Sequence, residues 1–163
     1  MIMTKLANSR HCFVCGLENE FGLRLRLDSP REGFVSGKIS IPQAYQGWPG
    51  IVHGGIITAI LDEAAGRTAD TTGIPKSVYM TGTLKIRYRH PAKCDVPLLV
   101  EAELINRKGR VVTTKSRLLD ESRQLLAEAE IIFVQLENDL GMDHHNAGDE
   151  WILDGVEEKS DDL

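Results

Sequence analysis

The sequence predicts an α+β fold in which one long, buried central helix is wrapped by a curved antiparallel β-sheet of about six strands. Residues 54–69 are dominated by alanine, leucine and isoleucine, and they form a run too long for a strand. This run is apolar on nearly every side, which is typical of a helix surrounded by other elements. Shorter segments of alternating polarity flank it, and short connections between them indicate antiparallel pairing.

Two strands are expected before the helix, over residues 23–27 and 35–41. In the first, three leucines alternate with two arginines. In the second, apolar residues and a glycine alternate with serine and lysine. Both patterns are typical of a strand with one buried face. Pro42 ends the second strand, and residues 43–52 form the loop that leads to the helix.

Four more strands are expected after the helix, over residues 79–89, 98–105, 111–119 and 126–136. Pro91 closes the first of them. A hairpin turn at residues 106–110, which contains Gly109, joins the second to the third. A polar turn at residues 120–124 joins the last two. The order of strand, strand, helix and four strands fits a single helix inside a curved sheet.

One domain is expected over residues 1–136, followed by a loosely attached acidic tail over residues 137–163. Apolar residues make up 42% of the chain and charged residues 26%, as in ordinary soluble proteins. The net charge of −5 argues against a nucleic-acid partner. No apolar run is long enough to span a membrane, and residues 1–10 lack an apolar signal segment. Three cysteines make no disulfide framework, so a cytoplasmic location is expected.

The helix and the turn before it carry the candidate chemistry. Gly54 and Gly55 open the helix, and a glycine-rich helix start exposes backbone N–H groups that bind oxyanions. Asp62 and Glu63 interrupt the apolar helix about two turns later, and buried helices rarely carry free carboxylates without a reason. One segment therefore offers both an oxyanion-binding end and a candidate general base or nucleophile.

Three motifs resemble the hotdog-fold acyl-CoA thioesterases, especially the phenylacetyl-CoA thioesterase-like group. The resemblance spans roughly residues 12–136, and His-Gly-Gly with an acid nine positions after the histidine is its most specific part. The motifs are Cys12-Phe13-Val14-Cys15-Gly16 with Asn19 and Gly22-Leu23, Pro49-Gly50-Ile51-Val52-His53-Gly54-Gly55 with Leu61-Asp62-Glu63, and Lys85-Ile86-Arg87-Tyr88-Arg89-His90-Pro91-Ala92.

The resemblance implies hydrolysis of an acyl-CoA thioester without a metal or cofactor. It places the substrate carbonyl against the Gly54 N–H, makes Asp62 the catalytic acid residue, and gives Thr81 the role of holding the attacking water. Gly55 has no side chain to block the substrate. Alternatives remain for two of these residues, because Asp62 can be a structural carboxylate that caps a neighbouring segment and Thr81 an ordinary strand threonine.

The spacing of Gly54 and Asp62 predicts a dimer. Eight residues at about 1.5 Å each separate them by roughly 12 Å along the helix, whereas a carbonyl and its attacking oxygen need to be about 3 Å apart. Two antiparallel helices around a twofold axis could pair Gly54 of one chain with Asp62 of the other. We therefore expect a homodimer or a dimer of dimers, as the resemblance also implies.

Other residues near the helix receive supporting roles. Glu63 lies four residues before Arg67, the favourable spacing for a helical ion pair, so we expect it to pair there. His53 precedes the helix, where a histidine more often orients the turn than acts as a base. Gln46 is a weaker candidate for holding the acid or the substrate.

Coenzyme A carries several phosphate charges, so two basic groups are candidate contacts. The first is the turn with Arg107, Lys108 and Arg110, and the second comprises Arg87, Arg89, His90 and Lys93. A charged hairpin tip and a solvated sheet face are the ordinary alternatives. Tyr45 and Trp48, in the loop before the helix, could line the acyl pocket.

Several competing functions stay open. Cys12 and Cys15 could form half of a zinc site completed by His144 and His145, although the resembling thioesterases share this cysteine pattern with no metal implied. A thiol-based esterase is less favoured, because neither cysteine has a nearby predicted base. A non-catalytic acyl-CoA-binding or regulatory module on the same scaffold, or an enoyl-thioester hydratase, remains a further alternative.

Overall fold

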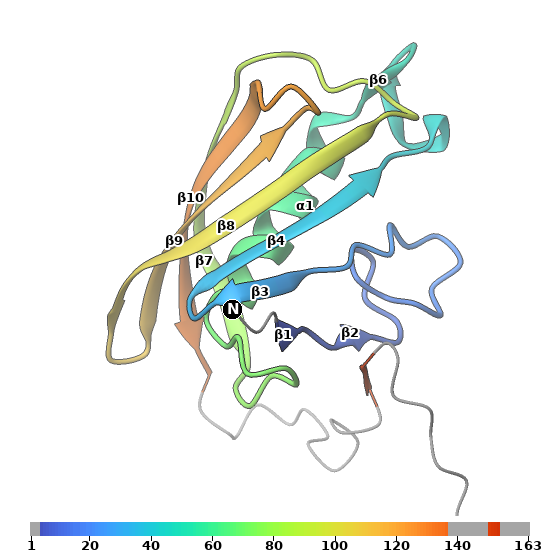
Figure 1. Ribbon diagram of the computed structural model, residues 1–163. Coiled ribbons are helices and arrows are strands. Elements are labelled where there is room, and N and C mark those ends of the chain that lie inside the picture. The colour runs from blue at the N-terminus through green and yellow to red at the C-terminus, as the bar shows by residue number, and fades with distance from the viewer. Residues whose placement is uncertain (1–3, 137–149, 154–163) are drawn as a thin grey trace, which may run out of the picture.

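The computed structural model describes residues 4–136 and 150–153. Its centre is helix α1 (Gly54–Arg67), which lies across the concave face of a seven-stranded sheet (Figure 1). The arrangement predicted from the sequence, one central helix wrapped by an antiparallel sheet, is confirmed. Within the described residues, no helix combines the length and the apolarity needed to cross a lipid bilayer.

The large sheet is antiparallel at every junction between neighbouring strands. In spatial order its strands are β1 (Thr4–Lys5), β3 (Asp28–Arg31), β4 (Phe34–Ser40), β8 (Pro97–Lys108), β9 (Val111–Leu119), β10 (Leu125–Gln135) and β7 (Tyr79–Tyr88). The four strands after the helix match the predicted ones to within three residues at each end. Strand β7 lies at an edge of this sheet, and its partner is β10.

Two small sheets complete the described part of the chain. Near the helix start, the 3₁₀ turn η1 (Gln43–Tyr45) leads into β5 (Gln46–Trp48), which pairs with β6 (Ile51–Val52). At the other end of the molecule, β2 (Asn8–Ser9) pairs with β11 (Trp151–Ile152). Trp151, which the sequence assigns to the tail, therefore packs on the folded chain, with its ring 4.8 Å from the Arg67 guanidinium carbon.

The core lies between α1 and the sheet. Ile60, Leu61 and Ala64 of the helix are fully buried, in one apolar cluster with β-strand residues such as Val100 and Ile131. The helix ends two residues earlier than predicted. The Thr68 hydroxyl donates to the Ala65 carbonyl at 2.7 Å, and this tightens the last turn.

The predicted strand over residues 23–27 is wrong. Arg24 adopts a positive φ of 54°, so the segment cannot continue a regular ladder. Its backbone instead bonds to the preceding loop, where Leu23 N–H donates to Phe13 O and Leu25 N–H to Val14 O, both at 2.9 Å. The strand begins later, at Asp28. The predicted alternation still holds for burial, because Leu25 and Leu27 are buried and the two arginines are exposed.

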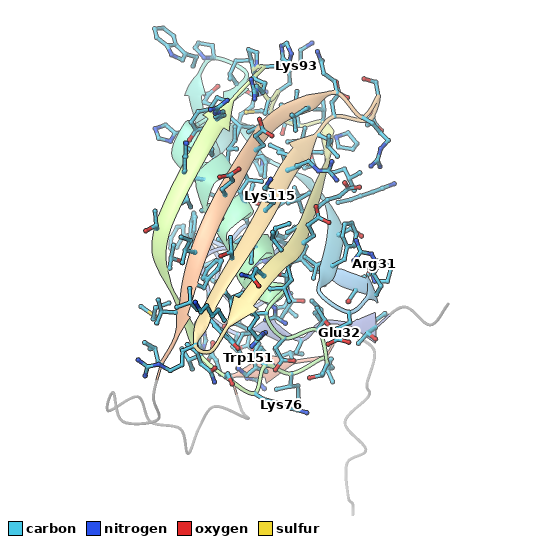
Figure 2. All side chains as sticks on the ribbon, turned by 90° about the vertical axis from the view of Figure 1, so that its left-hand side faces the viewer. Arg31, Glu32, Lys76, Lys93, Lys115 and Trp151 are labelled. Carbon is cyan, nitrogen blue, oxygen red and sulfur yellow. The ribbon has the colours of Figure 1, made fainter. Side chains whose placement is uncertain are left out.

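The outer face of the sheet is charged and carries ion pairs such as Arg117–Glu101 at 3.1 Å and Lys115–Glu130 at 3.7 Å. Lys115 lies near the middle of this face in Figure 2. A hollow of about 350 Å³ lies over it, but none of Gly54, Asp62 and Thr81 contributes to its lining. The candidate chemistry therefore lies on the other side of the sheet, at the helix.

Candidate active site

Within the described residues, the start of α1 leaves one backbone N–H without an acceptor. The Nδ1 atom of His53, the N-cap residue, accepts a hydrogen bond from the Gly55 N–H at 3.0 Å. The His53 carbonyl accepts from Ile56 and Ile57 at 3.0 and 3.2 Å. The Gly54 N–H has no acceptor among the described residues. It lies at the positive end of the helix dipole, so it can donate to an oxyanion.

Glycine at position 55 makes the His53 cap possible. A Cβ atom there would lie 3.1 Å from the His53 Nδ1, so a side chain would press on the capping ring. The cap in turn occupies the Gly55 N–H and leaves the Gly54 N–H as the available donor. His53 therefore orients the turn, which is the role expected from the sequence.

Tyr88 and Thr58 also hold the turn at the start of α1, although neither belongs to the His53-Gly54-Gly55 motif. The Tyr88 hydroxyl donates to the Gly54 carbonyl at 2.9 Å and lies 2.7 Å from the Thr58 hydroxyl. The Thr58 hydroxyl also donates to the Gly54 carbonyl at 2.9 Å. Sequence reasoning missed both residues as parts of the site. The alternation of the strand offered a signal for Tyr88, because it shares a strand face with the half-buried Leu84 and Ile86.

Asp62 is held from strand β7. The Thr81 hydroxyl lies 2.9 Å and 3.1 Å from the two Asp62 carboxylate oxygens, and the carboxylate is the acceptor. Asp62 is half-buried, and this burial raises the pKa of its carboxyl group, whereas the Thr81 hydrogen bond lowers it. The site thus contains an oriented carboxylate whose proton affinity is increased by its surroundings.

Glu63 does not form the predicted ion pair with Arg67, and that expectation is wrong. The Arg67 guanidinium turns toward the N-terminal segment, where it donates to the Ala7 carbonyl at 2.8 Å. Glu63 instead lies beside a thiol, with its Oε2 atom 3.7 Å from the Cys12 Sγ. Burial raises the pKa of Glu63 to about 7.

The loop residues lie around the helix start. The Gln46 side chain accepts from the Gly50 N–H at 2.9 Å and so closes its own turn, on a different element from Asp62. Trp48 is 79% exposed. Tyr45 packs edge-on against Phe13, with ring centroids 6.3 Å apart. In a single chain, the Trp48 side chain is therefore open to solvent near the start of α1.

The structure places the two predicted basic groups at opposite ends of α1. Arg89 and His90 follow the end of β7 that holds Gly54, and Arg89 forms an ion pair with Glu128. Arg107 lies beyond the other end of the helix, where it donates to the Tyr79 hydroxyl and the Ala69 carbonyl. The exposed residues Lys108 and Arg110 sit at the tip of the β8–β9 hairpin, at lower left in Figure 1. In Figure 2, Lys93 marks the helix-start end.

Replacing His53 tests the capping geometry. We expect His53→Ala to lower the free energy of unfolding by about 1 kcal/mol, because the Gly55 N–H loses its side-chain acceptor. The matched variant His53→Asn supplies another good N-cap acceptor and should recover most of that loss. Denaturant unfolding measures both; equal stability of His53→Ala and the parent chain would contradict the cap.

Three comparisons with known proteins agree on the kind of protein this chain resembles. Residues 49–127, just under half of the chain, match the family model described as "Thioesterase superfamily". The acyl-coenzyme A thioesterase THEM4 of Mus musculus is 35% identical over 94 residues, which cover 56% of this chain and 39% of the mouse protein. The chain thus spans well under half the length of the curated relatives it matches.

Solved structures show the same fold. A crystal structure described as a thioesterase superfamily protein is 33% identical, with a TM-score of 0.69 over 77% of this chain and 60% of that one. A Streptococcus mutans protein solved with bound acetyl CoA is 19% identical, with a TM-score of 0.62 over 69% of this chain and 88% of that one. The expected hotdog fold is therefore confirmed.

Proposed function

We propose that this chain is an acyl-CoA thioesterase, which hydrolyses an acyl-CoA thioester to a free acid and coenzyme A. The matches to the thioesterase superfamily and to the mouse acyl-coenzyme A thioesterase support this reaction class. The free Gly54 N–H and the oriented Asp62 carboxylate support the residue roles. Gly54 polarises the thioester carbonyl, and Asp62 acts as general base or nucleophile.

The two groups act in one site only when two chains pair. Gly54 and Asp62 lie on the same helix, roughly 12 Å apart along its axis, which is too far for one carbonyl. The described residues do not close the helix face that carries them, because Thr58, Ala59 and Asp62 stay half-buried. A second copy of the chain is the proposed cover.

Strand β7 supports a particular pairing. It is a ten-residue edge strand without proline, and such an edge offers unpaired N–H and C=O groups to another strand. Thr81, near its first end, holds Asp62, and Tyr88, at its last end, holds Gly54. Antiparallel pairing of two β7 strands about their middle brings the Tyr88 end of one level with the Thr81 end of the other. Gly54 of one subunit then approaches Asp62 of the other.

The single observation that carries the proposal is that the two ends of β7 contact different residues of the site. Thr81, near one end, donates to the Asp62 carboxylate, and Tyr88, at the other end, donates to the carbonyl of Gly54, the residue whose N–H is the proposed oxyanion donor. In the general-base route, Asp62 takes a proton from water as the water oxygen bonds to the carbonyl carbon, and the C–S bond then breaks with CoA thiolate leaving. In the nucleophilic route, the Asp62 oxygen bonds to that carbon first, and water then hydrolyses the resulting anhydride.

The same pairing assigns the basic groups to coenzyme A. Arg89 and His90 lie at the Gly54 end of their own chain, and the antiparallel partner brings its β8–β9 hairpin, with Lys108 and Arg110, to that end. These cations suit the phosphate groups of CoA. Trp48 and Gln46 lie in the loop next to the start of α1, and we assign them to substrate contact.

Release of free thiol from a panel of acyl-CoAs tests the proposed function directly. A thioesterase releases thiol from at least one member of the panel, and Asp62→Asn slows that release by about 10²–10⁴-fold. Binding of the panel without thiol release would instead support the non-catalytic binding module. An absorbance change of an enoyl-CoA without thiol release would support hydration.

The pH dependence of the reaction reports on Thr81. Asp62 acts as the carboxylate, so the rate falls as pH drops through the pKa of Asp62, which burial has raised. Thr81→Val removes the hydrogen bond that lowers this pKa, so we expect the acidic limb of the kcat profile to move to higher pH. Thr83→Val, on the same strand and also exposed, is the control and should leave the limb in place.

A further inference from the structure

Cys12, Cys15 and Glu63 form a cluster outside the proposed catalytic groups. Their ligand atoms, two sulfurs and a carboxylate oxygen, all lie within 4.8 Å of one another. Cys15 is buried, and the other two are half-buried. The cysteines come from the loop before β3 and the glutamate from the middle of α1, so the fold assembles the cluster from distant segments.

Hydrogen bonds from backbone N–H groups and a glycine hold the turn that carries the two cysteines. The Gly16 N–H donates to the Cys12 carbonyl at 2.8 Å, and the Val14 N–H donates to the Cys12 Sγ at 3.3 Å. A Cβ atom at position 16 would lie 2.2 Å from the Cys12 carbonyl oxygen, so only glycine fits this turn. A backbone N–H that donates to a cysteine sulfur orients and stabilises it as an anionic ligand.

The Cys12–Glu63 separation fits a tetrahedral zinc ion. Zn–S bonds of about 2.3 Å and Zn–O bonds of about 2.1 Å place a sulfur and an oxygen ligand roughly 3.6 Å apart. The distance from Cys12 Sγ to Glu63 Oε2 is 3.7 Å. Two soft sulfurs with one carboxylate also match the ligand preference of Zn²⁺ more closely than that of Mg²⁺ or Ca²⁺.

The cluster also lacks a direct ion pair among the described residues, although the positive charge of Arg67 lowers the pKa of Glu63. The ion pairs of the described residues do not include Glu63, since Arg67 turns away to the Ala7 carbonyl. In the empty cluster the Cys12 thiol donates to the Glu63 carboxylate, whereas two thiolates and a carboxylate packed this closely would be costly without a cation. A divalent ion would remove this cost by binding two thiolates and the carboxylate.

The geometry points to a zinc site formed by Cys12, Cys15 and Glu63, with a water molecule as the fourth ligand. Binding displaces the two thiol protons into solvent. The ion ties the loop before β3 to α1 at the residue directly after Asp62, so it fixes the helical turn that carries the proposed catalytic carboxylate. The site stands on its own ligands and does not depend on the proposed reaction.

Metal binding by the full-length reduced protein tests the site. Zinc analysis after addition of Zn²⁺ and removal of excess should give about one zinc per chain. Cobalt substitution of the same protein should give a thiolate-to-cobalt charge-transfer band and the visible bands of tetrahedral Co²⁺. A reduced parent chain that retains no zinc and gives no such spectrum overturns the proposal, whatever the variants do.

Variants assign the ligands. Cys12→Ser and Cys15→Ser should lose the zinc and the cobalt band, and Glu63→Gln should weaken zinc binding by at least about tenfold. Cys94→Ser is the matched control, because Cys94 is buried elsewhere and should leave stoichiometry unchanged. His144 and His145 lie outside the described residues; a variant with alanine at both should keep its zinc. If that double-alanine variant lost its zinc while Glu63→Gln bound zinc fully, Glu63 would not be a ligand.

Thermal unfolding supplies a readout independent of activity. Zinc should raise the Tm of the parent chain and of Cys94→Ser, because a ligand that binds only the folded state stabilises it. The same addition should leave the Tm of Cys12→Ser unchanged. An equal zinc-dependent rise in all three proteins would overturn the assignment.

Discussion

Asp62→Asn should lower kcat for acyl-CoA hydrolysis by about 10²–10⁴-fold, the usual contribution of a positioned general base. Asparagine keeps the size of the side chain and can still accept the Thr81 hydroxyl through its carbonyl oxygen. It cannot take a proton from water or form an anhydride with the acyl group. The fold and the binding of coenzyme A should therefore stay intact while turnover is lost.

Steady-state thiol release and an unfolding curve measure these two effects on one preparation. Asp70→Asn is a useful control, since Asp70 holds its own loop by accepting from Thr72 and Lys76 beyond the helix end. That variant should alter stability more than kcat. Unchanged turnover in a folded Asp62→Asn protein would remove Asp62 from the mechanism.

Gly54→Pro should lower kcat by about 10²–10³-fold, because it deletes the N–H that polarises the carbonyl. Position 54 is the first residue of α1, where proline is well tolerated in helices. The preceding residue, His53, already has φ −61° and ψ 136°, a conformation compatible with a following proline. The change therefore removes the donor while leaving the backbone path of the helix start in place.

Gly54→Ala is the matched control for the added side chain. A Cβ atom at position 54 would lie 3.4 Å from the Tyr88 ring, close to ordinary contact, and alanine keeps the N–H. We expect this variant to retain most of the activity. If Gly54→Ala and Gly54→Pro lost activity equally, the effect would come from crowding against Tyr88 and the oxyanion role of the N–H would be wrong.

Local sequence patterns predicted the fold well where the structure of an element depends mainly on its own residues. The apolar run fixed the position of the helix, and the alternating segments after it became β7 to β10. The segment over residues 23–27 alternates as regularly, yet it forms no strand, because Arg24 adopts a positive φ and the preceding loop takes its hydrogen bonds. Alternation reports which side chains are buried; it does not report which backbone groups pair.

The glycine-rich helix start and the two adjacent acids marked α1 as the candidate site, and the resemblance to the thioesterases chose Gly54 and Asp62 within it. Spacing within the helix favoured a Glu63–Arg67 pair, but tertiary contacts brought Cys12 to Glu63 and Ala7 to Arg67. The support that Tyr88 gives to Gly54 joins residues 34 positions apart, which no local pattern reveals.

A mixed dimer tests the central claim most directly. One chain carries Asp62→Asn and the other Gly54→Pro, and differently tagged copies are co-purified. If each site combines Gly54 of one subunit with Asp62 of the other, this dimer keeps one intact site and should show about half of the activity of the parent dimer. A dimer of one parent chain and one chain with both substitutions should then be inactive. The reverse pattern, an inactive first dimer and a half-active second, would place both groups in the same chain and contradict the account.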